Sequence, residues 1–147
     1  MRIVIYKLFE NEEVLYNLGI LLEQLFNKKT IGVFCDENII DFLDKKFWTF
    51  STNSFLPHDI ADGTENDEKQ PILLSSDALK IDREIICVFN NKDLDKITSY
   101  IQEKKLKKVK DIIYMTQEDL KIEEIRKKDS SIDIDYFEKN NGKWIKK

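Results

Sequence analysis

Short apolar runs alternate along the chain with stretches in which apolar residues recur every three or four positions. The runs are rich in β-branched and aromatic residues, as in buried strands, and lie at 3–8, 30–35, 71–74, 84–89 and 109–115. Helical spacing occurs at 14–26, 39–48, 93–105 and 117–128. Asp36 is placed to cap the second of these helices. The pattern therefore predicts strands and helices in alternation.

This alternation favours the α/β fold class. Strand, helix and parallel strand form right-handed crossovers, which place helices on both faces of a largely parallel sheet. A chain of 147 residues with 41% hydrophobic content can bury one core. We therefore expect residues 1–147 to form a single three-layer domain with a mixed, largely parallel sheet, similar to a nucleotide-binding fold.

Two segments depart from the alternation. Residues 51–70 are rich in Ser, Asn, Asp, Gly and Thr, which predicts a long surface loop. Residues 131–147 place β-compatible residues on both sides of the Asn-Asn-Gly sequence at 140–142, which predicts a hairpin-like extension. Long loops in compact domains often carry function, so residues 51–70 are of interest.

Charge and cysteine usage narrow the possible partners and the compartment. The formal net charge of -4 argues against direct binding of nucleic acid, which depends on surplus Lys and Arg. No apolar run approaches the roughly 20 residues of a membrane helix, so we expect no membrane contact. Cys35 and Cys87 lie inside apolar runs, which predicts buried free thiols rather than a disulfide. These features predict a protein of the reducing cytoplasm.

The turn after the first predicted strand lacks the glycines of a phosphate-binding loop. Residues 8–13 read Leu-Phe-Glu-Asn-Glu-Glu, and their three carboxylates would repel phosphate. The chain has four glycines, and none forms a Gly-x-Gly-x-x-Gly or Gly-Lys-Ser/Thr sequence. The sequence therefore argues against the binding of a nucleoside triphosphate, and we expect no cofactor.

His58 is the only histidine, which excludes a metal site built on two histidines. The acidic residues within 59–68 lack the ligand spacing of an EF-hand and are better explained as a solvated loop. One alternative is a small α/β enzyme, dependent on a nucleotide or metal, with His58 as general base beside these carboxylates. No motif places a nucleophile or second acid, so we expect neither a metal site nor a catalytic residue.

One segment resembles a known protein family. Residues 47–58 place Phe-Trp at the end of the second predicted helix and then Ser-Phe-Leu-Pro-His after a short gap. This motif is similar to the most recognisable part of the chi subunit family of bacterial DNA polymerase III. Further features fall in the family's order, at 6–8, at 69–74 and at 136–144. The resemblance spans nearly the whole chain.

The resemblance implies a non-catalytic accessory subunit that binds other replication proteins. In the family, the motif surface contacts the small psi subunit, which ties chi to the clamp loader. The implied psi-facing residues are Trp48, Phe55, Leu56, Pro57 and His58. Large rigid aromatic side chains and a proline-fixed backbone suit a binding anchor. The alternative for Trp48 and Phe55 is that they pack into the core at the junction of helix and loop.

The family also captures the acidic C-terminal tail of single-stranded-DNA-binding protein, in a basic groove with an apolar pocket for the terminal Phe. Residues 104–128 contain nine basic and five acidic residues, a local charge of +4, so the remainder carries -8. Such an asymmetry suits an acidic partner. The implied tail-binding residues are Lys121, Arg126, Lys127 and Lys128. Lys121 and Lys128 lie seven positions apart and share one helical face.

The chain departs from the family pattern at the end of this segment. The family continues Ala-Arg-x-x-Trp/Tyr-Lys, whereas residues 125–130 read Ile-Arg-Lys-Lys-Asp-Ser. Arg126 matches the family arginine, but Lys128 and Asp129 replace the aromatic-Lys pair. Ordinary solvated helix ends remain an alternative for the individual lysines. The sequence thus favours a replisome adaptor, with the small enzyme as the alternative and direct DNA binding as the weakest interpretation.

Overall fold

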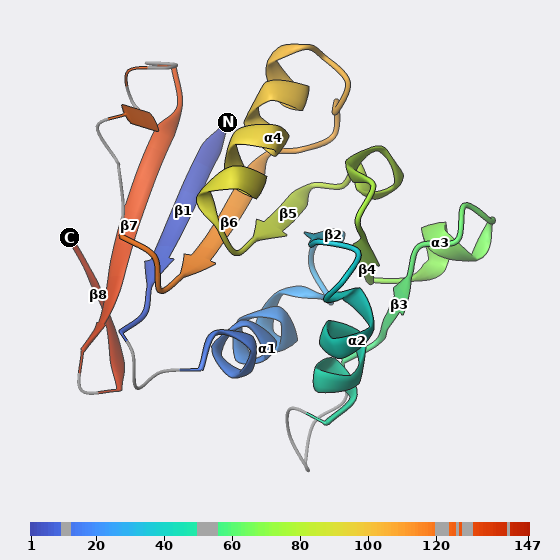
Figure 1. Ribbon diagram of the computed structural model, residues 1–147, viewed down its shortest axis with the longest axis horizontal. Coiled ribbons are helices and arrows are strands. Elements are labelled where there is room, and N and C mark those ends of the chain that lie inside the picture. The colour runs from blue at the N-terminus through green and yellow to red at the C-terminus, as the bar shows by residue number, and fades with distance from the viewer. Residues whose placement is uncertain (10–12, 50–55, 120–123, 126, 128–130, 141) are drawn as a thin grey trace.

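The computed structural model describes all residues except 10–12, 50–55, 120–123, 126, 128–130 and 141. This part forms one α/β domain with an eight-stranded sheet of order β3-β4-β2-β5-β6-β1-β7-β8 (Figure 1). The strands are β1 (Arg2–Lys7), β2 (Ile31–Phe34), β3 (His58–Ile60), β4 (Ile72–Ser75), β5 (Ile85–Val88), β6 (Asp111–Thr116), β7 (Asp133–Asn140) and β8 (Lys143–Lys146). The helices are α1 (Val14–Leu25), α2 (Ile40–Thr49), α3 (Asn66–Lys69), α4 (Asn91–Gln102) and the 3-10 helix η1 (Ala78–Ile81). The predicted fold class is confirmed.

The sheet is parallel except at one edge. Every neighbouring pair of strands is parallel apart from β7 and β8, which are antiparallel. Parallel neighbours need a crossover connection, and α1 and α4 supply crossovers between β1 and β2 and between β5 and β6. Within the sheet, Ile3 of β1 lies between Ile112 of β6 and Ile134 of β7.

Helices cover both faces of the sheet, which explains why its inner strands are apolar at consecutive positions. In β6, Ile113 and Met115 belong to the core cluster beneath α1 and α2, whereas Ile112 and Tyr114 belong to the cluster beneath α4. Figure 1 shows α1 and α2 on one side of the sheet and α4 on the other. A strand buried on both faces has no solvent side and therefore loses the alternation of an exposed strand.

The ends of α4 differ from the predicted ends by two or three residues. The Asn90 side chain accepts a hydrogen bond from the backbone N–H of Asp93 at 2.8 Å and so caps a helix that begins at Asn91. Lys104 adopts a positive φ of 63°, and this left-handed residue follows a helix that ends at Gln102. No helix in the described part of the chain is long and apolar enough to cross a membrane.

Part of the segment 51–70 has regular structure. β3 pairs with β4 at the edge of the sheet, with His58 opposite Ile72, and α3 follows it. The composition of this segment predicts only a surface loop, because an edge strand of three residues carries no apolar run of its own. Pairing with β4 supplies its backbone hydrogen bonds, and it fixes the position of His58 in the sheet.

The C-terminal segment, for which the sequence predicts a hairpin, contains β7 and β8. Gly142 in the turn has a φ of 78°, a conformation that glycine adopts without steric cost. Tyr6 of β1 stacks on Phe137 at 5.3 Å and meets the edge of Trp144 at 5.0 Å. β7 also pairs in parallel with β1, so it extends the main sheet rather than standing apart from it.

The predicted helix at 117–128 does not begin at 117, because residues 117–119 are not helical, and residues 120–123, 126 and 128 lie outside the described part of the chain. Within it, residues 124, 125 and 127 are helical, and Ile125 packs against the core cluster beneath α4.

Both cysteines lie in the described part of the chain. Cys35 and Cys87 are buried and form no disulfide, as predicted.

Candidate functional site

Trp48 lies exposed at the C-terminal end of α2. Phe47, its neighbour on the helix, is buried in the core, whereas Trp48 is 51% exposed. Consecutive residues of a helix point about 100° apart, so one aromatic side chain holds the helix on the sheet while the next faces outward. Asp44, one turn earlier on α2, is partly exposed and lies beside the same surface.

The imidazole ring of His58 packs against the indole ring of Trp48. Its imidazole lies 4.7 Å from the Trp48 indole and 5.5 Å from the Phe47 ring, measured between ring centroids. Nδ1 lies 2.6 Å from the Leu56 carbonyl oxygen. Nε2 lies 3.0 Å from Oδ1 of Asp44 and 3.2 Å from the Asp44 carbonyl oxygen. The buried histidine thus ties the end of α2 to β3.

The motif residues separate into an exposed side chain and its support. Trp48 is exposed, whereas Leu56 and His58 are buried and Pro57 is partly buried. Leu56 belongs to the core cluster together with Phe47, so it is a supporting residue in this structure. Phe55 lies outside the described residues. The structure therefore brings Trp48 and His58 into contact, while their role in binding a partner stays a prediction.

An apolar groove lies at the carboxyl edge of the sheet, near the N-terminal ends of α1 and α2. Its volume is about 330 Å³, and it is lined by Val14, Leu15, Ile39, Phe42, Leu43, Phe89, Thr116, Gln117 and Glu118. Phe42 is 55% exposed and Ile39 is 42% exposed. In open α/β sheets, the carboxyl edge is the usual place for ligands. The sequence predicts a helix that contains Ile39 and Phe42, and it does not predict this groove. A signal for the groove is that apolar residues occupy more than one face of α2.

Lys7 forms hydrogen bonds with the backbone of polar residues at the edge of this groove. Its Nζ donates hydrogen bonds of 2.6 Å to the carbonyl oxygens of Gln117 and Glu118, and it lies 3.9 Å from a carboxylate oxygen of Asp119. The Glu118 carboxylate accepts hydrogen bonds from the backbone N–H and side chain of Asn91. These contacts fix residues 117–119 relative to β1 and α4.

The predicted tail-binding residues follow this rim. Lys127 is exposed and helical. Lys121, Arg126 and Lys128 lie outside the described residues, so their proposed grouping stays a prediction. Gln117 and Glu118, at the start of the predicted helix 117–128, line the apolar groove, and neither carries a positive charge.

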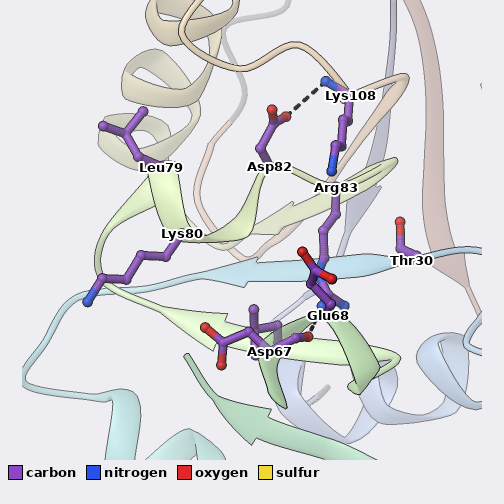
Figure 2. A pocket seen from close by; sticks show the side chains of 9 residues that line it. Thr30, Asp67, Glu68, Leu79, Lys80, Asp82, Arg83 and Lys108 are labelled. Atoms are coloured by element: carbon purple, nitrogen blue, oxygen red, sulfur yellow. Dashed lines mark hydrogen bonds between the residues drawn. The ribbon is translucent and has the colours of Figure 1, made fainter. Parts of the chain in front are cut away.

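A second hollow, of about 480 Å³, lies at the amino edge of the sheet (Figure 2). Its buried cation, Arg83, donates hydrogen bonds to the backbone carbonyls of Gln70, Pro71 (3.2 Å) and Asp67 (2.5 Å). Burial lowers the pKa of Arg83, and the nearby Asp67 charge opposes this shift. The Asp82 carboxylate accepts hydrogen bonds from the backbone N–H groups of Lys107 and Lys108. The charges here hold backbone segments together.

The acidic loop uses its carboxylates in the same way. Asp62 accepts hydrogen bonds from the backbone and hydroxyl of Thr64, which lower the pKa of this carboxyl. Asp67 accepts from the backbone N–H groups of Asp62 and Gly63. Among the described residues, no three His, Cys, Asp or Glu side chains gather as a metal site. These carboxylates thus shape the turn that precedes α3.

The fold and these surfaces define a three-layer α/β protein with an exposed aromatic side chain at one end of α2 and an apolar groove at the other. Over residues 1–128, the chain matches the family model described as DNA polymerase III chi subunit, HolC. The match covers most of the 147 residues, so the chain belongs to the DNA polymerase III chi subunit family. Its role is therefore an accessory one in DNA replication. A search of curated proteins finds no match.

Proposed function

We propose that this chain is an adaptor that links the clamp-loader complex, through a psi subunit or an equivalent component, to the C-terminal tail of single-stranded-DNA-binding protein. The observation that carries the proposal is the half-exposed Trp48, seated on a buried histidine within the family motif. An aromatic side chain on a rigid support binds with little loss of conformational entropy. The two binding surfaces use opposite ends of α2.

Psi recognition centres on Trp48. Truncation of a central tryptophan at a protein interface costs about 2 kcal/mol or more, which corresponds to about thirtyfold in affinity. We expect Trp48→Ala to weaken psi binding by at least this factor in isothermal titration calorimetry. Leu79→Ala is the matched control, because Leu79 is 56% exposed on η1, away from the motif. Equal affinities of the two variants would contradict the psi assignment.

Tail capture combines the apolar groove with the cationic residues predicted at 121–128, in the segment that begins at the rim of the groove. A tail that ends in acidic residues and Phe needs an apolar slot and nearby cations, and the groove lies where residues 117–128 begin. Phe42 supplies exposed aromatic area for this slot. Phe42 and Trp48 are six residues apart on one helix, so their side chains point about 120° apart and serve different partners.

Titration with a synthetic peptide of this chemistry tests the tail site. We expect micromolar binding that weakens as salt is added, because the contact includes screened charges. Phe42→Asp and the double variant Lys121→Ala/Lys128→Ala lower the affinity. Leu79→Asp and Lys28→Ala/Lys80→Ala are the matched controls. No binding at low salt, or equal loss in the controls, would contradict the assignment.

A further inference from the structure

The surroundings of His58 select one protonation state. Nδ1 faces the Leu56 carbonyl oxygen at 2.6 Å, and Nε2 faces the Asp44 carboxylate at 3.0 Å and the Asp44 carbonyl at 3.2 Å. Carbonyl and carboxylate oxygens accept hydrogen bonds and donate none. Only a ring with protons on both nitrogens, which is the cationic form, can donate to both sides.

The neutral ring fits the same place poorly. It carries one proton, so one nitrogen lone pair must face an oxygen atom, and a buried polar contact of this kind is costly. Asp44 of α2 is the charged residue that contacts the ring among the described residues. Leu56 contributes its carbonyl, Phe47 and Trp48 contribute aromatic rings, and the paired strand β4 places apolar Ile72 opposite.

We propose that cationic His58 is the positioning residue for Trp48, so that the charge on this one imidazole controls how the chain presents its partner-binding indole. The indole lies 4.7 Å from the imidazole, within the distance at which an aromatic ring attracts a cation. This inference rests on the proposed binding of psi through Trp48.

The coupling between the two rings is measurable in the free chain. His58 is the only histidine, so its ring resonances need no assignment, and Trp144→Phe leaves Trp48 as the only tryptophan. A cationic imidazole in contact with an indole quenches its fluorescence. We expect Trp48 fluorescence to fall as the pH is lowered, over the same interval in which the His58 ring resonances report the second proton. His58→Gln in this background abolishes the pH-dependent quenching.

A second pair of variants keeps the test informative if His58→Gln fails to fold. Asp44→Asn removes the carboxylate charge that faces Nε2, while Asp41→Asn removes an exposed carboxylate one turn earlier on the same helix. We expect quenching in Asp44→Asn to need a lower pH than in Asp41→Asn. Identical profiles in the two variants, or quenching that does not follow the His58 ring resonances, would overturn the inference.

Binding of purified psi subunit then tests the consequence for function. Loss of one hydrogen bond to a charged group corresponds to about tenfold in affinity, so we expect binding about tenfold tighter at the low-pH end of the His58 transition than at its high-pH end. In His58→Gln this pH ratio disappears. If Trp48→Ala abolishes binding but the pH ratio is the same with and without His58, only this inference fails. If Trp48→Ala binds psi normally, the proposed psi contact fails, and this inference fails with it.

Discussion

Replacing Arg83 by methionine removes the cation that holds the amino edge of the sheet together. The guanidinium donates to the backbone carbonyls of Asp67 in α3 (Figure 2), of Gln70 and Pro71 before β4 and, at 3.5 Å, of Ile31 in β2. Methionine reproduces the apolar stem of arginine and ends short of the guanidinium, so the variant keeps the packing of the stem and removes the charge and its hydrogen bonds. Lys80→Met is the control, because Lys80 lines the same hollow but is exposed.

The expected loss of stability follows from these bonds. A hydrogen bond to a charged group contributes about 1.5–3 kcal/mol, and the abandoned carbonyls are only partly buried and regain some hydration. We therefore expect Arg83→Met to lower the free energy of unfolding by about 3 kcal/mol. For a chain of this size, that loss corresponds to a fall in Tm of about 6–12 °C.

Urea unfolding followed by circular dichroism measures this effect. Arg83→Lys retains the charge but cannot reach three carbonyls at once, so it should fall between the wild type and Arg83→Met. Hydrogen exchange should locate the weakening in α3 and at the start of β4, since the carbonyls of Asp67 and Pro71 lose their donor. If Arg83→Met is as stable as Lys80→Met, the assignment of Arg83 as a structural clamp is wrong.

Three further predictions concern other parts of the molecule. Burial raises the pKa of the Cys35 and Cys87 thiols to about 12, so a thiol reagent at pH 8 should modify neither in the native chain and both in denaturant. Lys7→Met should weaken tail-peptide binding severalfold in calorimetry, because it frees the start of 117–128; unchanged affinity would contradict this. In Gly32→Ala the new Cβ would lie 2.8 Å from Cβ of Ile81, so urea titration should show a loss of about 1–3 kcal/mol rather than a gain.

Much of the fold is predictable because its inner strands are buried on both faces. Strands such as β5, residues Ile85–Val88, therefore appear as continuous apolar runs between amphipathic helices. The strands at and near the ends of the sheet are harder to predict. β7 contains Asp133, Asp135 and Glu138 because it is only partly buried, and β3 is three residues long. Their places depend on pairing with β1 and β4, which the apolar pattern does not encode.

The candidate site was predictable in part. The motif identified Trp48 and His58, and the structure brings their rings into contact. The sequence could not tell that Trp48 faces outward while Leu56 is buried, because both are apolar and their directions depend on how α2 and β3 pack. The apolar groove was missed for the same reason. Whether Phe42 is covered depends on the neighbouring α1, not on the spacing within α2.

The most direct test of the adaptor role is a single calorimetric comparison of two variants against both partners. We predict that Trp48→Ala loses at least thirtyfold in affinity for psi and retains tail-peptide binding. We predict the reverse for Phe42→Asp, which should lose the peptide and retain psi. Loss of one partner and retention of the other in each variant is the result expected of an adaptor with two independent binding surfaces. Variants that bind both partners as the wild type does, or that lose both together, would contradict the account.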